Sequence, residues 1–450
     1  MSRLGAVPSA QTIPLTCPRN LPMSGSAPTS FRWTICALLF AATTVNYIDR
    51  QILSLLKPVL EVEFGWTNAQ FGWLNSLFQG AYAISLLGFG WFIDRFGTKL
   101  GYAVSIVAWS LSAAAHALAG SFQGFAASRI ALGLGEGGNF PAAIKTVAQW
   151  FPVGDRAFVT TLFNSGANVG ALVAPATIPF IAAALGWQAA FLIAGGIGLV
   201  WVVAWWYLYS APRDSRFANA AEVALIEAGQ VAETTEAPLP WGSLLGYRGT
   251  WGFILMKCIT DPVWWFFLIW LPGYFKDVYH QDIKESAGKL VAIYAIVTVV
   301  SIAGGFVSKL MVQRGWSVTA TRKACMMVFA LAVVPILLVP HFNDPWIAVA
   351  LIGLAGGAHQ GWSATIMTTV SDLFPRRAVA SIIGMGGMAG ALGGMLFPVG
   401  TGILLDHYKA LGSINTGYGI LFGACAFAYL VAFVVSHLLT PKFTPVKIDG

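Results

Sequence analysis

The sequence has 450 residues, three times the ~150 of an average soluble domain, and length alone would suggest two or three domains. Its composition argues otherwise, because 57% of the residues are hydrophobic and only 10% are charged, against roughly 45–50% and 25% in soluble domains. So few charges exclude a soluble enzyme, a disordered tail protein and a nucleic-acid-binding protein, and the net charge of +7 needs another explanation.

Long apolar stretches dominate the sequence. A membrane-spanning helix needs about 20 mostly apolar residues, and lipid offers no partner for free backbone groups, so helices are the only spanning structure these stretches can form. The sequence therefore predicts an all-α membrane protein with twelve transmembrane helices. They are expected at residues 31–56, 68–93, 99–120, 121–149, 157–184, 187–209, 250–275, 286–310, 323–340, 345–371, 378–405 and 416–439.

Lysine and arginine predict the orientation, because basic residues are retained on the cytoplasmic side of a membrane. With the N-terminus inside, 17 of the 26 fall in cytoplasmic segments, 5 in external segments and 4 inside the spans. Both termini are therefore expected in the cytoplasm, and the multi-pass chain in the inner (plasma) membrane. Most of the positive charge is accounted for by topology.

The hydrophilic segments predict the domain organisation. Residues 1–30 contain five prolines and no continuous apolar core, which favours a disordered cytoplasmic N-terminus over a signal peptide and leaves Met1 or Met23 as the start. Residues 211–249 form the one long hydrophilic linker. It separates an N-terminal six-helix bundle, 31–210, from a C-terminal one, 250–440, and residues 441–450 are a cytoplasmic tail.

The two halves resemble each other. The glycines at 133 and 138 recur 223 positions later, and those at 166 and 170 recur at a shift of 220. Their preserved order predicts parallel six-helix repeats, an architecture in which transporters bind substrate at the repeat interface. The corresponding pairs are Gly133 and Gly356, Gly138 and Gly361, Gly166 and Gly386, and Gly170 and Gly390.

Gly133, Gly135 and Gly138 also form a G-x-G-x-x-G pattern. No strand precedes it, and it lies within a predicted membrane helix, so a dinucleotide site is rejected. Close approach of neighbouring helices is the better interpretation.

Several motifs resemble a known family. The stretch GWFIDRFGTK, with Gly90, Asp94, Arg95, Gly97 and Lys99, resembles the conformational loop between the second and third spans of the major facilitator superfamily. NYIDRQ at 46–51, SRIALGLGEGGNFPAAIKTVAQWFP at 128–152 and FNSGANVGAL at 163–172 resemble its anion:cation symporter branch. TDPVWWFFLIWLPGYF at 260–275 and the segment 358–395 look most like its hexuronate (glucuronate and galacturonate) transporters. The resemblance covers about residues 31–440 and implies the major facilitator fold.

Ionisable residues inside the spans indicate function, because each costs at least ~2.5–3.5 kcal/mol near mid-membrane. Arg129 and Glu136 are two helical turns apart on one face of the fourth span, and either pair with each other or each pair with the first span. Asp49 and Arg50 point about 100° apart, so one can face Arg129 while the other faces a cavity.

Arg50 is the candidate for binding a substrate carboxylate, because its planar guanidinium matches a carboxylate bidentately. We expect Asp49 and Glu136 to be buried near arginines, where the protonation of a carboxyl can switch with conformation as proton coupling requires. Fixed salt bridges between the first and fourth spans are the structural alternative. In the resembling branch the arginine binds the anion, the two acids carry protons, and the residue at Arg129 is a gate or a partner of Glu136.

Other polar residues are weaker candidates. The resemblance implies that Tyr47, Tyr82 and Asn168 line the cavity, where they would hydrogen-bond sugar hydroxyls, with ordinary packing as the alternative. The repeat aligns Glu136 with His359, and His359 with Gln360 would bind hydroxyls or join the proton path, unless the histidine is structural.

One further pair of charges lies in the seventh span. Lys257 and Asp261 are spaced to neutralise each other on one helix face. The adjacent Trp264 and Trp265 either pack against a sugar face or serve interfacial packing.

The predicted function is proton-coupled symport that imports a sugar acid anion of the hexuronate class by alternating access. Carriers of other organic anions (galactonate, glucarate or an aromatic carboxylate) are the alternative, followed by a membrane sensor and a polytopic membrane enzyme. The expected partners are a small organic anion, protons and the bilayer. No enzyme activity, cofactor, metal or nucleic acid is expected, the protein is expected to be a monomer, and the choice between proton and sodium stays open.

Overall fold

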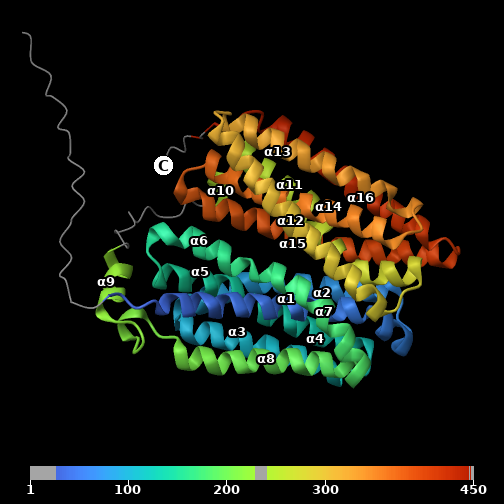
Figure 1. Cartoon of the computed structure of the whole chain (residues 1–450), viewed down its shortest axis with the longest axis horizontal. Helices are drawn as coiled ribbons and strands as arrows, with labels where there is room; N and C mark the ends of the chain where they lie inside the picture. The colour runs from blue at the N-terminus through green and yellow to red at the C-terminus, as the bar shows by residue number, and fades with distance from the viewer. Residues whose placement is uncertain (1–26, 229–240, 445, 447–450) are drawn as a thin grey trace, which may run out of the picture.

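The computed structural model describes residues 27–228, 241–444 and 446, and in this part of the chain every regular element is helical (Figure 1). The predictions made for residues 1–26, including Met23 as a start, lie outside the described residues. Each predicted span corresponds to one helix or to two consecutive helices.

Among the described residues, the N-terminal half contains eight α-helices and the C-terminal half six, with two short α-helices between them. The first half consists of α1 (Phe31–Phe64), α2 (Asn68–Phe96), α3 (Thr98–Ala115), α4 (Phe122–Glu136), α5 (Asn139–Trp150), α6 (Val153–Asn164), α7 (Gly166–Leu185) and α8 (Trp187–Leu208). The linker carries α9 (Ala220–Ala228) and α10 (Trp241–Leu244). The second half consists of α11 (Arg248–Tyr279), α12 (Ile283–Gln313), α13 (Val318–Val333), α14 (Pro345–Leu373), α15 (Arg376–Ala410) and α16 (Ile414–Leu439).

The predicted fourth span is not one helix. It divides into α4 and α5 at Gly137 and Gly138, just after Glu136. Serines on neighbouring helices bind the carbonyls of the last turn of α4: Ser85 donates to Leu134 O, and Ser105 Oγ donates to Gly135 O at 2.7 Å. Carbonyls that accept from other helices are less available to the helical ladder, and glycines tolerate the resulting break. The predicted fifth span divides similarly at Ser165, between α6 and α7.

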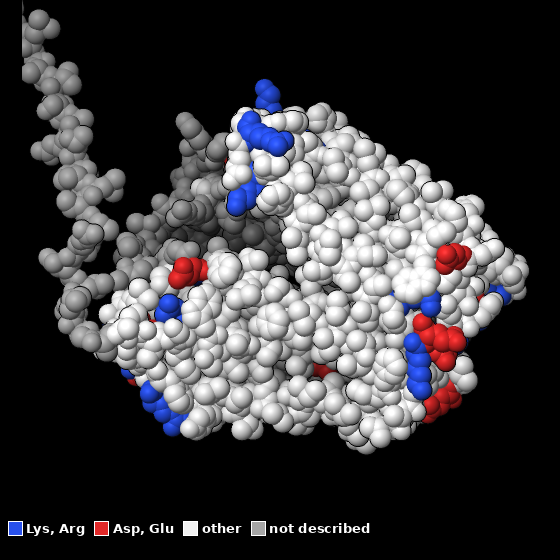
Figure 2. All heavy atoms as spheres, viewed as in Figure 1, with Lys and Arg blue, Asp and Glu red and all other residues white. Residues whose placement is uncertain are grey.

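Length and surface character place the chain in a membrane. Within the described residues, ten helical segments are long and apolar enough to span a bilayer. The two other predicted spans are the broken α4 and α5 and the more polar α14, which contains His359 and Gln360. Figure 2 shows charged side chains gathered mainly at the two ends of the molecule, with a broad band between them that carries almost no charge on this face. The protein is therefore a multi-pass membrane protein.

The halves form two bundles that face each other (Figure 1), with α2 packed on α15, α7 on α12 and α1 on α11. The repeat glycines contact corresponding helices in each bundle. Gly133 packs on α2 and Gly356 on α12, while Gly166 packs on α1 and Gly386 on α11. The interpretation of these glycines as sites of close helix approach is confirmed.

Two adjacent glycines on α8 test this packing. A Cβ at Gly195 would lie 2.5 Å from Ser110 O on α3, whereas a Cβ at Gly196 would meet no atom within 4 Å. Overpacking costs about 1–3 kcal/mol, so Gly195→Val is expected to lower the apparent Tm of the purified protein by several degrees. Gly196→Val is the matched control and should leave the Tm unchanged in a thermal-unfolding assay; equal Tm values for the two variants would contradict the packing.

The linker is attached to the start of α1. Glu222 of α9 is fully buried and accepts hydrogen bonds from the backbone N–H groups of Phe31 (3.2 Å) and Arg32 (3.0 Å). Its carboxylate also pairs with the Arg32 guanidinium at 3.1 Å. A carboxylate at a helix N-terminus accepts hydrogen bonds from the free N–H groups and interacts favourably with the positive end of the helix dipole. The hydrophilic linker thus anchors the helix that carries Asp49 and Arg50.

Candidate functional site

The site is centred on an ion pair between α1 and α4. Arg50 Nε lies 2.6 Å from Glu136 Oε2, and the two side chains are 8% and 0% exposed. Glu136 is the last residue of α4 and lies beside the helix break. Of the two pairings that the sequence left open for Glu136, the structure contains the one with the first span.

Arg129 and Asp49 lie beside this pair and are both 1% exposed. Arg129 Nη2 donates to Asn75 Oδ1 on α2 at 3.0 Å, but its Nε and Nη1 have no hydrogen-bond partner within the described part of the chain. Both carboxylate oxygens of Asp49 are likewise unpartnered among the described residues. Buried polar groups are normally satisfied, so these atoms indicate a place where a ligand, water or proton is accommodated.

Aromatic rings surround the Arg50 guanidinium. Its Cζ lies 4.4 Å from the ring centroid of Tyr82, 5.3 Å from that of Tyr47 and 5.4 Å from that of Phe78. The fourth ring, Trp265, lies at 5.8 Å and comes from α11 in the other bundle. Cation–π contacts hold the guanidinium in place without occupying its N–H donors. Arg50 therefore lies at the junction of the two bundles with its charge still available to an anion.

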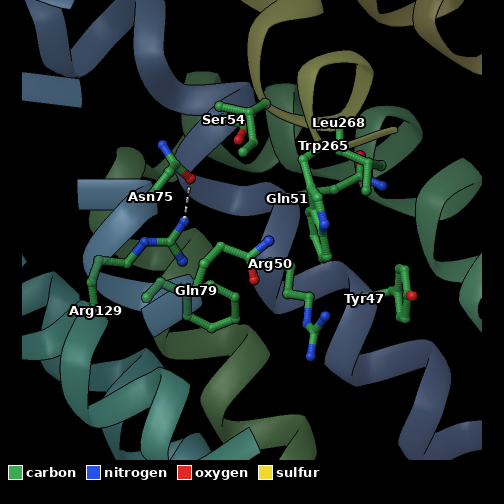
Figure 3. Close-up of a pocket in the computed structure, with 11 residues that line it drawn as sticks. Tyr47, Arg50, Gln51, Ser54, Asn75, Gln79, Arg129, Trp265 and Leu268 are labelled. Atoms are coloured by element: carbon green, nitrogen blue, oxygen red, sulfur yellow. Dashed lines mark hydrogen bonds between the residues drawn. The ribbon is translucent and has the colours of Figure 1, made fainter. Parts of the chain in front are cut away.

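A narrow cavity of about 20 Å³, room for about one water molecule, adjoins this cluster (Figure 3). The two arginines contribute to it from the N-terminal bundle, and α11 supplies the wall from the C-terminal bundle. The lining residues are Tyr47, Arg50, Gln51, Ser54, Asn75, Phe78, Gln79, Arg129, Trp265, Leu268 and Ile269.

Wider cavities lie toward the predicted cytoplasmic end. One, of about 1090 Å³, extends from Tyr82 past Gly90 and Asp94 between α2, α5 and α15. A second, of about 370 Å³, is lined by Tyr47, Asn168 and Gln360, among others. Figure 2 shows the surface hollowed between the bundles at this end. Four of the predicted cavity residues, including both tyrosines, thus line cavities between the bundles.

The opposite end is closed by contacts between the bundles. Asp406 of α15 accepts hydrogen bonds at 2.8 Å from Asn68 N and Ala69 N, the first N–H groups of α2. Glu61 of α1 pairs with Lys409 of α15 at 2.7 Å and with Lys276 of α11 at 3.4 Å. The bundles are therefore joined at the predicted external end and separated at the predicted cytoplasmic end.

His359 is not among the lining residues of these cavities. It is buried, its Nδ1 lies 2.5 Å from the Tyr429 hydroxyl, and its ring stacks on Trp264 with centroids 5.3 Å apart. These contacts lie within the C-terminal bundle and correspond to the structural interpretation of the histidine. Lys257 and Asp261 form the predicted neutralising pair, at 2.6 Å. Trp264 stacks on His359 and also lines the second wider cavity, whereas Trp265 lines the narrow cavity.

The loop motif lies at the predicted cytoplasmic end of α2. Asp94 pairs with Lys145 of α5 at 2.7 Å, Lys99 lies over the ring of Trp206, and Arg95 is exposed. Gly97 has φ +87°, which favours glycine at the turn into α3. Here Asp94 bonds within its own bundle.

Sequence reasoning missed the uncharged polar residues of the narrow cavity. Gln51, Ser54 and Gln79 are each at most 2% exposed, and each has side-chain atoms without a partner among the described residues. Asn75 and Gln79 are four residues apart, so they share one face of the second span, and this spacing of two amides in an apolar helix was the available signal.

Two opposed helical bundles with buried charges and a cavity between them define a membrane transporter rather than an enzyme. The chain belongs to the Major Facilitator Superfamily, whose family model matches residues 39–398. The hexuronate transporter of Escherichia coli (strain K12) is 31% identical over 417 residues, covering 91% of this chain and 94% of that protein. The D-galactonate transporter of Escherichia coli O6:H1 is 27% identical over 429 residues, covering 92% and 99%.

The fold is also shared with solved structures. A bacterial homologue of the human lysosomal transporter Spinster has a TM-score of 0.72 at 16% sequence identity, over 92% of this chain and 98% of that chain. The predictions of an all-α membrane protein with the major facilitator fold and of a transporter are confirmed.

Proposed function

We propose that the protein is a proton-coupled symporter that imports a hexuronate-class sugar acid by alternating access. The observation that carries this proposal is that one guanidinium, Arg50, is bonded to Glu136 and lines a cavity between the bundles. The named relatives transport hexuronate and galactonate, which supports a sugar acid as the substrate.

The charges of the site give a physical reason why substrate binding would be coupled to proton binding. Asp49, Arg50, Arg129 and Glu136 together carry two positive and two negative charges when ionised. A substrate carboxylate adds an uncompensated negative charge in a buried site and competes with Glu136 for Arg50. Protonation of Glu136 removes both obstacles, because the neutral acid releases the arginine and the cluster returns to neutrality. Substrate and proton therefore bind together.

Alternating access follows from the asymmetry of the two ends. The bundles separate at the predicted cytoplasmic end and are bonded at the other end through Asp406 and Glu61. Rocking of the bundles about the site would break these contacts and close the wider cavities. In the inner membrane, whose interior side is negative, co-transported protons offset the work of accumulating an anion, about 2.3 kcal/mol per charge per 100 mV.

The decisive experiment is uptake of labelled D-glucuronate into proteoliposomes, with and without an inward proton gradient at matched ionic composition. The proposal expects accumulation only with the gradient and no dependence on sodium. Uptake indifferent to the gradient would refute proton coupling. Competition by unlabelled galactonate, glucarate and benzoate ranks the alternative substrates.

The external contacts give a separate prediction. Asp406→Ala removes a carboxylate of the other bundle that accepts from the first N–H groups of α2; like a helix cap, such an interaction is worth about 1 kcal/mol, or roughly fivefold in an equilibrium. The outward-open population should rise, and with it the labelling of a cysteine at Leu268 by an external membrane-impermeant thiol reagent, in a chain whose native cysteines are replaced by serine. The control is Asp344→Ala, which removes the cap of α14, a bond to Trp346 N at 2.8 Å within one bundle. Equal labelling in the two variants would contradict a role in closure.

A further inference from the structure

We propose that Gln79, Ser54 and Gln51 form a hydroxyl-binding subsite that selects polyhydroxylated acids over simple carboxylates. The inference rests on the proposed function and extends it by naming the residues that hydrogen-bond the substrate's hydroxyls, whereas Arg50 binds its carboxylate.

The first observation is a concentration of unsatisfied polar atoms. Gln79 is 1% exposed, and neither its Nε2 nor its Oε1 has a hydrogen-bond partner among the described residues. The same holds for Ser54 Oγ and Gln51 Nε2, at 1% and 2% exposure. Leaving a buried polar atom unbonded costs about 1–3 kcal/mol. Three such side chains around one cavity are therefore expected to bind something that enters it.

The second observation is that all three side chains line the cavity that Arg50 and Arg129 also line. Ser54 is four residues after Arg50 on α1, about 6 Å along the helix axis, and Gln79 comes from α2. In Figure 3 the Gln79 amide lies between Arg129 and Trp265. A ligand whose carboxylate binds Arg50 would therefore extend its remaining atoms toward these uncharged groups once rocking of the bundles widens this narrow cavity.

The other bundle completes the subsite. A Cβ at Gly394 of α15 would lie 2.7 Å from Trp265 Cδ1 and 3.2 Å from Gln79 Nε2. The absence of a side chain at position 394 thus leaves room for the indole and the amide together. Trp265 supplies an apolar face and Gln79 supplies a donor and an acceptor, a combination that suits a sugar, whose ring has apolar C–H faces and hydroxyls at its edge.

The chemistry of the subsite is specific to hydroxyl groups. A carboxamide donates through nitrogen and accepts through oxygen, so one glutamine can bond two neighbouring hydroxyls, and a serine hydroxyl does either. No formal charge is involved, so the subsite adds nothing to the charge balance of the ion-pair cluster. A site with buried groups built to hydrogen-bond a ligand rejects analogues that leave those groups unpaired.

The test compares two ligands that share a carboxylate on a six-membered ring: D-glucuronate, and cyclohexanecarboxylate, which lacks hydroxyls. Equilibrium binding to the purified full-length protein is measured by calorimetry, with competition for the weaker ligand. Gln79→Leu is expected to weaken glucuronate binding about five- to tenfold, the worth of one or two neutral hydrogen bonds, and to leave cyclohexanecarboxylate unchanged or tighter. Ser54→Ala should act in the same direction by a smaller factor.

Gln188→Leu, an exposed glutamine on α8, is the matched control and should change neither affinity. A glucuronate affinity unchanged in both subsite variants, or a loss of equal factor for both ligands, would overturn the subsite. Such a result would leave the proposed function standing, because wild-type binding and uptake of glucuronate test that separately. Wild-type protein that binds no sugar acid would overturn both.

Discussion

Arg50→Lys is expected to abolish measurable binding and transport of the sugar acid. The ammonium keeps the positive charge but loses the planar fork that holds a carboxylate bidentately. Truncating one partner of a buried, hydrogen-bonded charge pair costs about 2–5 kcal/mol, which corresponds to roughly 30-fold to several-thousand-fold in affinity. Calorimetry with glucuronate measures the loss.

The control is the same replacement at Arg213, in an exposed pair with Glu227 on the linker, which should have no effect on affinity. The apparent Tm of Arg50→Lys must stay near that of the wild type for the loss to be assigned to binding. Retention of wild-type affinity by a folded Arg50→Lys protein would contradict the assignment of the carboxylate to this arginine.

The site residues that could be predicted from the sequence are the charged ones, because a charge inside a membrane has a large free-energy cost. Asp49, Arg50, Arg129 and Glu136 stand out because a charge in an apolar span requires a reason, and the structure brings Arg50 and Glu136 into contact at 2.6 Å. The choice of partner was not predictable. The two residues are 86 positions apart, and helical periodicity gives the face of each helix but not how the helices are rotated against each other.

Uncharged residues gave a weaker signal. Glutamine and serine are tolerated in membrane helices at low cost, so Gln79 and Ser54 became recognisable only when the structure placed their unpartnered atoms around a cavity. The break after Glu136 was missed for a similar reason. Its cause lies in Ser85 and Ser105, which belong to other helices and bind the carbonyls of the last turn of α4. Contacts between distant segments decided each of these features.

Glu136→Gln is expected to separate substrate binding from proton coupling. Glutamine has the shape of the protonated acid and, like it, carries no charge, so the ion pair that holds Arg50 is permanently absent and the cluster carries one net positive charge. Glucuronate binding should be retained or tightened, and exchange of labelled for unlabelled substrate across proteoliposomes should continue. Accumulation driven by a proton gradient should stop, because the group that must gain and lose the proton is absent. Loss of exchange together with accumulation would contradict this division of roles.

The same reasoning sets the sign of the pH dependence. In the wild type, deprotonated Glu136 competes with the substrate for Arg50, so glucuronate affinity should fall as pH rises. In Glu136→Gln that competition is gone, so the pH dependence should flatten, leaving only the contribution of Asp49. Calorimetric titrations of the two proteins over a series of pH values measure both slopes. A wild-type slope preserved in Glu136→Gln would transfer the coupling role to Asp49, whose carboxylate oxygens are both unpartnered among the described residues.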